Sequence, residues 1–185
     1  QWHSDGDYFG VLTTRQGKNK KQVISSFELF RMRQKDIPTD VIELTNQQQA
    51  DKPQEVLSVG FEPNGDRLMV AVKDEFKILV SFYQLSHHDK TGSLPTTKLL
   101  KTLERKLLTK FLWSPRGDYA LFTGMDATSG YMEFWSVNDY VLLWSKEHVT
   151  ATDAEWDPSG RFVLSYISYL RFQSDNAFIV SDFKG

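Results

Sequence analysis

Short apolar runs alternate with polar segments rich in Gly, Asn and Asp along the whole chain. Examples are Tyr8–Leu12, Arg67–Val72 and Arg161–Tyr166, each preceded by a polar turn segment. Runs of this length, enriched in β-branched and aromatic residues, are typical of β-strands. The pattern therefore predicts an all-β protein made of many short strands.

One phrase occurs four times. An aromatic residue is followed four residues later by Gly, and apolar residues resume shortly after it. The aromatic and Gly positions are Trp2 and Gly6, Phe61 and Gly65, Trp113 and Gly117, and Trp156 and Gly160. Three copies carry Pro two residues before the Gly, and the glycines lie 59, 52 and 43 residues apart. Such spacing is typical of propeller blades.

The phrase has a local physical meaning. Pro suits the second position of a type I turn, and Gly accepts the positive φ that follows, so the turn closes a hairpin with a bulge. The aromatic residue then ends one strand, and the residues after Gly begin its antiparallel partner. Because the tryptophans recur in register, we expect them in the blade core and not in a base-stacking platform. Asp7, Asp66 and Asp118 follow the Gly, which favours a structural role in the turn.

The segments after each phrase keep the same order. A strand leaves the Gly turn, and a second apolar run, a third strand and a fourth strand follow before the next phrase. A four-stranded meander of this kind is the blade of a β-propeller. The fold class predicted is therefore all-β, a WD40-type propeller with about four consecutive blades of a larger ring. We expect neighbouring blades to cover the runs Ile78–Val80 and Phe178–Val180.

The phasing places the blades at approximately 1–45, 46–104, 105–147 and 148–185, the first and last incomplete. Some helical spacing occurs over Leu99–Lys110, but propeller phasing requires two strands there. Asn46–Gln54 and Ser86–Thr96 are predicted exposed loops. Since open blade edges promote association, we expect residues 1–185 alone to be poorly soluble or to self-associate. The chain has the character of a piece of a longer polypeptide.

Composition narrows the function classes. Hydrophobic residues make up 40% and aromatic residues 14%, which suits a packed core. The net charge of −2 provides no overall basic field for nucleic acid, and the lack of Cys excludes disulfides and thiol chemistry. No apolar run approaches the roughly 20 residues of a membrane span. No catalytic arrangement, phosphate-binding Gly-rich loop or metal-ligand cluster is found, so we predict no enzyme activity and no cofactor. His87 and His88 beside Asp89 are interpreted as solvated loop residues.

Two local groups of cations are the candidate ribosome or RNA contacts. Arg15, Lys18, Lys20 and Lys21 fall in the predicted loop Thr13–Gln22, and Arg31, Arg33 and Lys35 follow a predicted strand. Lys and Arg held in this way bind phosphates with little sequence preference. The alternative is an ordinary solvated surface.

The stretch Ser25–Pro38 (SSFELFRMRQKDIP) resembles a signature of the family of the b subunit of eukaryotic translation initiation factor 3. Val80–Tyr83, Phe111–Gly117, Met132–Trp135, Glu147–His148, Ala151–Arg161 and Asp175–Phe178 are similar to its following blades. The likeness covers nearly the whole chain in order, and departs from the family mainly at the two long loops.

The resemblance implies a nine-bladed propeller and a non-enzymatic scaffold that docks on the small (40S) ribosomal subunit in the cytoplasm. It implies other subunits of the factor, namely a, i and g, as partners, and no membrane or small-molecule substrate. The segments of that family that recognise RNA or bind subunits i and g lie outside this chain. The alternatives are the propeller of initiation factor two A, against which Phe30–Pro38 argues, the propeller gate of a prolyl oligopeptidase-type serine peptidase, and a peptide adaptor.

Overall fold

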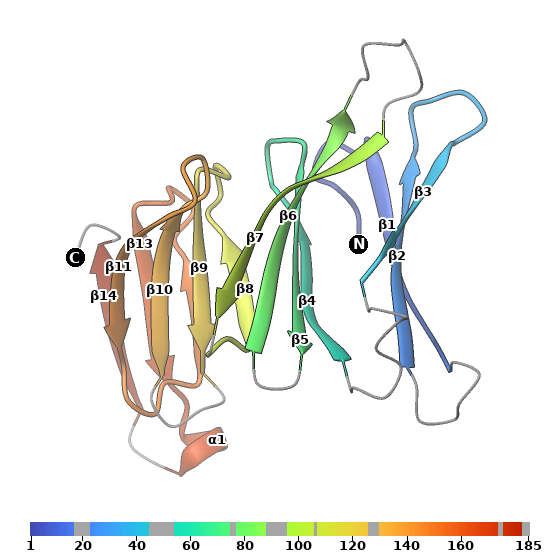
Figure 1. Cartoon of the computed structure of the whole chain (residues 1–185). Helices are drawn as coiled ribbons and strands as arrows, with labels where there is room; N and C mark the ends of the chain where they lie inside the picture. Colours follow the sequence, from blue (N-terminus) through green and yellow to red (C-terminus); the bar gives the residue numbers. More distant parts are fainter. Residues whose placement is uncertain are drawn as a thin grey trace. The chain divides into compact units, whose positions relative to one another are not determined.

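The computed structural model describes residues 1–16, 23–44, 54–74, 77–87, 96–105, 107–125, 130–173 and 176–182. These residues form fourteen strands and one helix of four residues, so the all-β prediction is confirmed (Figure 1). The chain divides into two compact units, Gln1–Lys106 and Leu107–Gly185. Each unit contains two antiparallel sheets in which strands pair in chain order.

Unit 1 (Gln1–Lys106) holds blades 1 and 2. Blade 1 consists of β1 (Tyr8–Gln16), β2 (Val23–Arg31) and β3 (Thr39–Glu43). Blade 2 consists of β4 (Gln54–Phe61), β5 (Arg67–Asp74), β6 (Lys77–His87) and β7 (Thr96–Arg105). Buried residues of both sheets, among them Phe27, Leu29, Phe61 and Leu68, form one core cluster.

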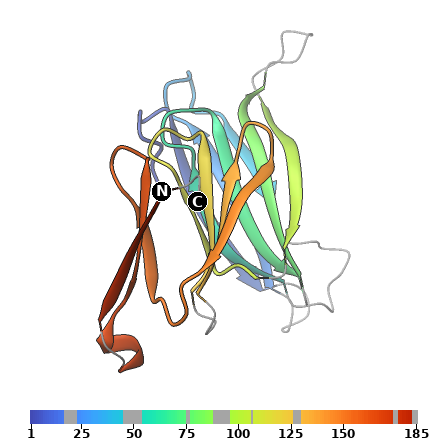
Figure 2. The same cartoon turned by 90° about the vertical axis from the view of Figure 1, so that its left-hand side faces the viewer.

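Unit 2 (Leu107–Gly185) holds blades 3 and 4. Blade 3 consists of β8 (Lys110–Trp113), β9 (Tyr119–Gly124), β10 (Tyr131–Ser136) and β11 (Val141–Glu147). Blade 4 consists of β12 (Asp153–Trp156), β13 (Phe162–Ile167) and β14 (Ala177–Asp182). The helix α1 (Tyr169–Phe172), which the sequence pattern did not predict, lies in the β13–β14 connection at one end of its sheet (Figures 1 and 2). No helix among the described residues is long and apolar enough to cross a membrane.

The four repeated turns are equivalent, as predicted. In each, the N–H of the residue after the aromatic donates to the carbonyl five residues on, at 2.8–3.0 Å. The pairs are His3 to Tyr8, Glu62 to Arg67, Ser114 to Tyr119, and Asp157 to Phe162. Gly6, Gly117 and Gly160 have positive φ, but Gly65 does not, so that part of the expectation is wrong. Gly65 is needed for space instead, because a Cβ there would lie 2.3 Å from the Glu62 carboxyl.

The repeat tryptophans have different environments. Trp156 packs between blades 3 and 4 as predicted, with its ring 6.1 Å from that of Phe134 and its indole N–H donating to Leu112 O at 3.3 Å. Trp113 is half-buried on β8. Trp2 is 58% exposed, contrary to the expectation of a core position. Trp2 is not part of a strand. It forms an isolated bridge with Phe9, and its ring packs on the Phe9 ring.

Strand bounds differ from the predicted ones at two places, in β1 and in β6. β1 runs to Gln16, so Thr13–Gln16 and Arg15 belong to a strand and not to a loop. Ser86 and His87 belong to β6, and the rest of 86–96 before Thr96 lies outside the described residues, as does 46–53. Phe178 and Val180, which share one face of β14, are 71% and 57% exposed, so the cover by a neighbouring blade that we expected there is not found among the described residues. The segment 99–110 forms parts of β7 and β8, as the phasing required.

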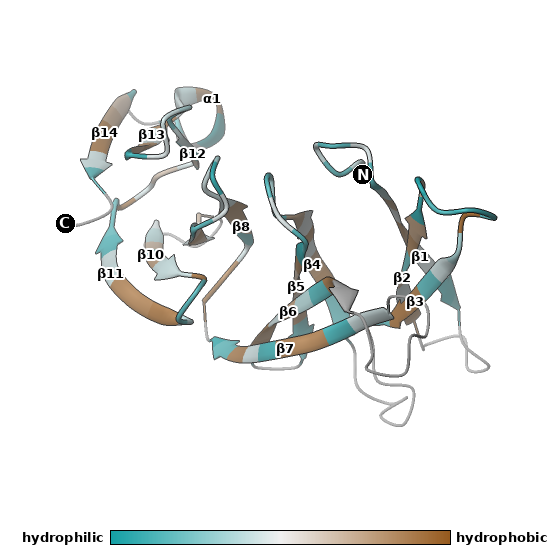
Figure 3. Ribbon diagram, turned by 90° about the horizontal axis from the view of Figure 1, so that it is seen from above, coloured by the Kyte–Doolittle hydropathy of each residue, from teal (hydrophilic) through white to brown (hydrophobic). Residues whose placement is uncertain are grey.

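The outermost strands of the two four-stranded blades share an irregularity. The register shifts opposite Phe82/Tyr83, where β7 has Leu100 as an extra residue, and opposite Phe134/Trp135, where β11 has Leu143. Both strands are largely exposed along their length and carry apolar stretches (Figure 3). β7 and β11 therefore each contain a β-bulge in the middle of the outer edge.

We expect Gly130→Ala to destabilise the fold by about 3 kcal/mol. Gly130 has φ +56°, and a Cβ would lie 1.9 Å from the carbonyl oxygen of His148, so backbone strain and a backbone clash add together. The control is Gly6→Ala, where φ is +73° but no atom lies within 4 Å of the added Cβ, and only the strain of about 1 kcal/mol remains. Denaturant unfolding of the two variants measures the difference, and equal losses would contradict this account.

Candidate functional site

Arg15 of the first predicted cation group and Arg31 of the second lie at opposite ends of the β1–β2 hairpin. Arg15 pairs with Ile24 near one end, and Arg31 pairs with Tyr8 at the other. At about 3.4 Å per residue the two ends are more than about 20 Å apart. Arg15 is exposed, and Lys18, Lys20 and Lys21 lie outside the described residues. Arg15 therefore does not form one continuous basic patch with the second group.

Arg31 is not available at the surface. Its side chain is only 2% exposed, its Nη2 donates to Asp40 Oδ2 at 2.6 Å, and its guanidinium lies 5.7 Å from the Tyr8 ring centroid. Nε and Nη1 of Arg31 are buried without a hydrogen-bond partner within the described part of the chain. The expectation of a phosphate contact at Arg31 is thus wrong, because burial between strands has fixed this charge inside the blade.

Arg33 and Lys35 remain exposed in the β2–β3 connection. Arg33 donates to the backbone oxygen of Asp5 at 2.7 Å, and its Nε lies 2.5 Å from Asp7 Oδ1. Since the Arg33 side chain is still 71% exposed, the pair is a surface one and contributes little stability. Arg33 therefore braces the first repeated turn while leaving part of its guanidinium open to solvent.

The side chain after each aromatic residue stabilises its turn, which the repeat phrase did not reveal. Ser114 Oγ accepts the Tyr119 N–H at 3.1 Å, and Glu62 holds Arg67 through two side-chain hydrogen bonds of 2.6 and 2.8 Å. Asp157 accepts four hydrogen bonds, from the Ser159 hydroxyl and from the backbone N–H groups of residues 159, 161 and 162. These donors, the Ser159 hydroxyl first, lower the pKa of Asp157 to about 2.

Turns of neighbouring blades also contact each other within each unit. In unit 1, His3 Nε2 lies 2.8 Å from Gly65 O, and Ser4 donates its hydroxyl to Pro63 O. The Asp5 N–H donates to His3 Nδ1, so the proton of the neutral ring is on Nε2 and points at Gly65. In unit 2, a Cβ on Gly160 would meet Pro115 at 3.3 Å. The turns thus form a packed rim on each pair of blades.

Asp40 joins blades 1 and 2 on their outer strands. Besides the buried Arg31, its Oδ2 accepts the backbone N–H of Thr97 at 3.1 Å and the Thr97 hydroxyl at 2.8 Å. Thr97 belongs to β7 and Asp40 to β3, which contact each other. One carboxylate oxygen therefore holds a buried cation of its own blade and two donors of the next.

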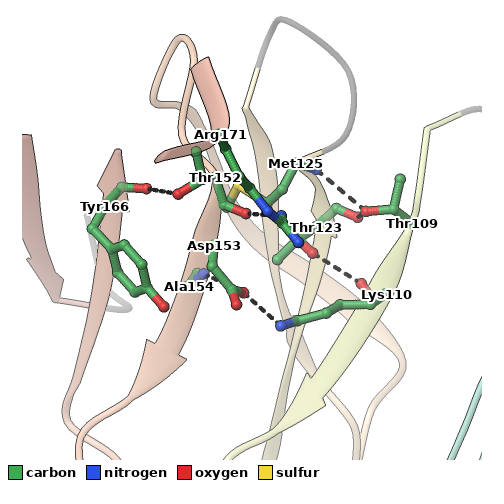
Figure 4. A network of polar contacts seen from close by, with 9 residues as sticks. All are labelled: Thr109, Lys110, Thr123, Met125, Thr152, Asp153, Ala154, Tyr166 and Arg171. Carbon is green, nitrogen blue, oxygen red and sulfur yellow. Dashed lines mark hydrogen bonds and ion pairs between the residues drawn. The ribbon is translucent and has the colours of Figure 1, made fainter. Parts of the chain in front are cut away.

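A second polar network joins blades 3 and 4 in unit 2 (Figure 4). Lys110, the first residue of β8, contacts Asp153, the first residue of β12, at 2.5 Å. Around this ion pair, Thr109, Thr123 and Thr152 bond to backbone groups, and Arg171 of α1 donates to Thr152 O at 2.9 Å. The helix is thereby attached to the start of the neighbouring β12 strand.

His148 adds a buried link between the same blades. It is 7% exposed, follows β11, and has Nδ1 2.8 Å from the hydroxyl oxygen of Ser165 on β13. Burial, and to a smaller degree the charge of Lys146, lowers the pKa of His148. The ring is therefore held neutral in the folded protein.

Among the described residues, no group of three or more His, Cys, Asp or Glu side chains is placed to hold a metal ion. His3 and His148 act in turns and links between blades, whereas His88 and Asp89 lie outside the described residues. The polar side chains of Asp40, Lys110 and His148 link neighbouring sheets.

Consecutive antiparallel meanders of three or four strands, each with an equivalent Gly turn near its start, define a segment of a WD40-type β-propeller. A solved structure described as "Crystal structure of the eukaryotic initiation factor" matches 95% of this chain and 40% of its own, with TM-score 0.62 and 14% identity. The WD40 domain of Toxoplasma gondii coronin matches 95% of this chain and 48% of its own, with TM-score 0.57 and 13% identity. These likenesses confirm the propeller fold.

The chain belongs to the family described as "Eukaryotic translation initiation factor eIF2A", whose model matches residues 1–185. It is 31% identical over its whole length to the B subunit of eukaryotic translation initiation factor 3 from Xenopus laevis. The chain spans 25% of the length of that relative. The resemblance to the b subunit that the sequence indicated is therefore confirmed. The description of the matching family carries the name of initiation factor two A, which was one of the alternatives.

We expect Asp40→Ala to lower the free energy of unfolding by about 3 kcal/mol, because it leaves the buried Arg31 cation without a partner. Adding Arg31→Met to Asp40→Ala should recover most of that loss, since no buried charge then remains. Glu104→Ala is the control, because its ion pair with Lys77 is exposed and its removal should leave stability nearly unchanged. Denaturant unfolding measures all three, and a double variant no more stable than Asp40→Ala would contradict the explanation.

We expect the Tm advantage of the parent protein over His148→Gln to shrink between pH 7.5 and pH 5. The folded state lowers the pKa of His148 below its ordinary 6.5, so the unfolded state takes up a proton more readily. The stabilising contribution of neutral His148 to the free energy of unfolding is complete above pH 6.5. It is lost as the pH falls toward the lower pKa of the folded state. Thermal unfolding across this range is the measurement, and a pH-independent difference would show that His148 does not titrate on unfolding.

Proposed function

We propose that this chain is part of a non-enzymatic scaffold subunit of translation initiation factor 3. Its propeller would dock on the 40S ribosomal subunit and organise other subunits, a, i and g among them, in the cytoplasm. The observation that carries the proposal is the 31% identity to the B subunit of that factor over the full length of this chain. The blade-linking contacts of Asp40, Lys110 and His148 support a rigid structural role.

Initiation factor two A is the second candidate, because the matching family carries its name. Affinity purification of the full-length protein at its natural abundance separates the two. Stoichiometric recovery of subunits a, i and g is expected for a subunit of factor 3. Recovery of the protein without them would favour factor two A.

Within the proposed role, the exposed cations of blade 1 are candidates for ribosome contact. Arg15 is an exposed cation next to the last residue of β1, and the chain continues from that end into Lys18, Lys20 and Lys21. Arg33 and Lys35 form a second, separate group at the other end of the hairpin, with Arg33 partly engaged by Asp7. The first group is the stronger candidate, because four positive charges fall within seven residues.

Replacing Arg15, Lys18, Lys20 and Lys21 by Ala should leave the fold intact and weaken attachment of the factor to the 40S subunit. Because each lost phosphate contact removes a counterion-release term, the slope of log affinity against log salt should fall by up to about 3. Binding assays across a salt series measure this. Lys98→Ala with Lys101→Ala is the control, since it removes exposed cations from β7 instead. Unchanged affinity of the quadruple variant at every salt concentration would show that the segment is only a solvated surface.

A further inference from the structure

A pocket in unit 2 lies between the repeated turns of blades 3 and 4. Its volume is about 330 Å³, within the range of small-ligand pockets. Ser114 of the blade 3 turn, 1% exposed, lines it, and Asp182 at the end of β14 borders it. The pocket also receives Arg116 and Asp118 from one turn and Arg161 from the other. Two cations and two carboxylates thus surround one small space.

Arg161 is a departure from the repeat. The residue after the turn Gly is Asp7, Asp66 and Asp118 in the first three copies and Arg161 in the fourth. The blade 4 turn nevertheless keeps the same closing hydrogen bonds, which use only the backbone of residue 161. The turn itself therefore does not require Arg at this position. The charge reversal adds a second Arg, besides Arg116, to the residues that line the pocket.

The two guanidiniums are not used by the fold. Within the part of the chain that the structure describes, Arg116 and Arg161 have no hydrogen bond or ion pair from their side chains, whereas Arg33 braces a turn. Arg161 lies over the Phe162 ring at 5.6 Å, which limits its freedom without neutralising it. Asp118 lines the same pocket, so a ligand that carries both a carboxylate and an ammonium group can pair with the two cations and with this carboxylate.

We propose that this pocket binds a segment of a partner protein in which an acidic side chain is followed closely by a basic one. The carboxylate is taken by Arg116 and Arg161, whose planar guanidinium groups suit it, and the ammonium lies against Asp118. The carboxylates of Asp118 and Asp182 border the pocket and repel a continuous line of phosphates, so the mixed charge favours a protein segment over RNA. This site is independent of the blade 1 cations assigned to the ribosome.

The test uses the full-length protein and fluorescence anisotropy with labelled, amidated peptides of sequence GGDGKGG and GGNGKGG, and with an oligouridine. We expect GGDGKGG to bind about tenfold more tightly than GGNGKGG, because only the first offers a carboxylate. Arg161→Asp, which restores the residue of the other three turns, and Arg116→Asn, which copies Asn64 of blade 2, should each weaken binding of GGDGKGG about tenfold. Neither change should lower Tm.

Lys101→Ala, which removes an exposed cation from β7, is the control and should leave peptide binding unchanged. The quadruple variant of the blade 1 cations should also keep peptide binding, so failure of the ribosome proposal is distinguishable from failure of this one. Equal binding of the two peptides, or no binding of either, overturns the proposal. An Arg161→Asp variant that loses affinity for oligouridine but not for GGDGKGG overturns it in favour of a nucleic-acid site.

Discussion

The backbone hydrogen bond that closes each repeated turn is the constraint on which the blades depend. It joins the residue after the aromatic to the carbonyl five residues on, and so brings the segments before and after the turn into antiparallel register. The side chain at that residue differs in every copy: His3, Glu62, Ser114 and Asp157. Each satisfies local donors in its own way, by a ring nitrogen, an ion pair, a hydroxyl or a carboxylate. The backbone hydrogen bond is therefore the same in all four turns, whereas the side chain at this position varies.

In each unit, buried apolar residues from both blades form one core cluster, and a few polar groups define the alignment of the blades. Apolar faces attract without direction, so two sheets can slide over each other at small cost. Asp40 against Thr97, Lys110 against Asp153 and His148 against Ser165 each require one relative position of neighbouring strands. Because buried polar groups are costly when unpaired, the contacts of Asp40 and His148 penalise alternative alignments of the blades, whereas the partly exposed pair of Lys110 and Asp153 has a smaller effect.

Local patterns sufficed to predict the fold but not the site. The phrase around Gly117 and Gly160 predicted turn positions, strand order and the packing of Trp156, because turn geometry and strand period are encoded within a few residues. The burial of Arg31 was not predictable, since it depends on Asp40 arriving from the next strand and on the Tyr8 ring. The signal that could have indicated the pocket was present in the repeat itself, as the replacement of Asp by Arg161.

The bulges at Leu100 and Leu143 have a consequence for the behaviour of the protein in concentrated solution. β7 and β11 are the outer strands of complete blades, and an outer edge of ten residues such as β7 could pair with the same edge of another copy. In a continuous ladder, the N–H and C=O groups of every second residue point toward the free edge. One extra residue shifts this alternation by one position in the middle of the strand. Any intermolecular pairing is therefore limited to a few residues on either side of the bulge. The irregular outer strand lets the protein keep leucines at its periphery without offering a template for fibres.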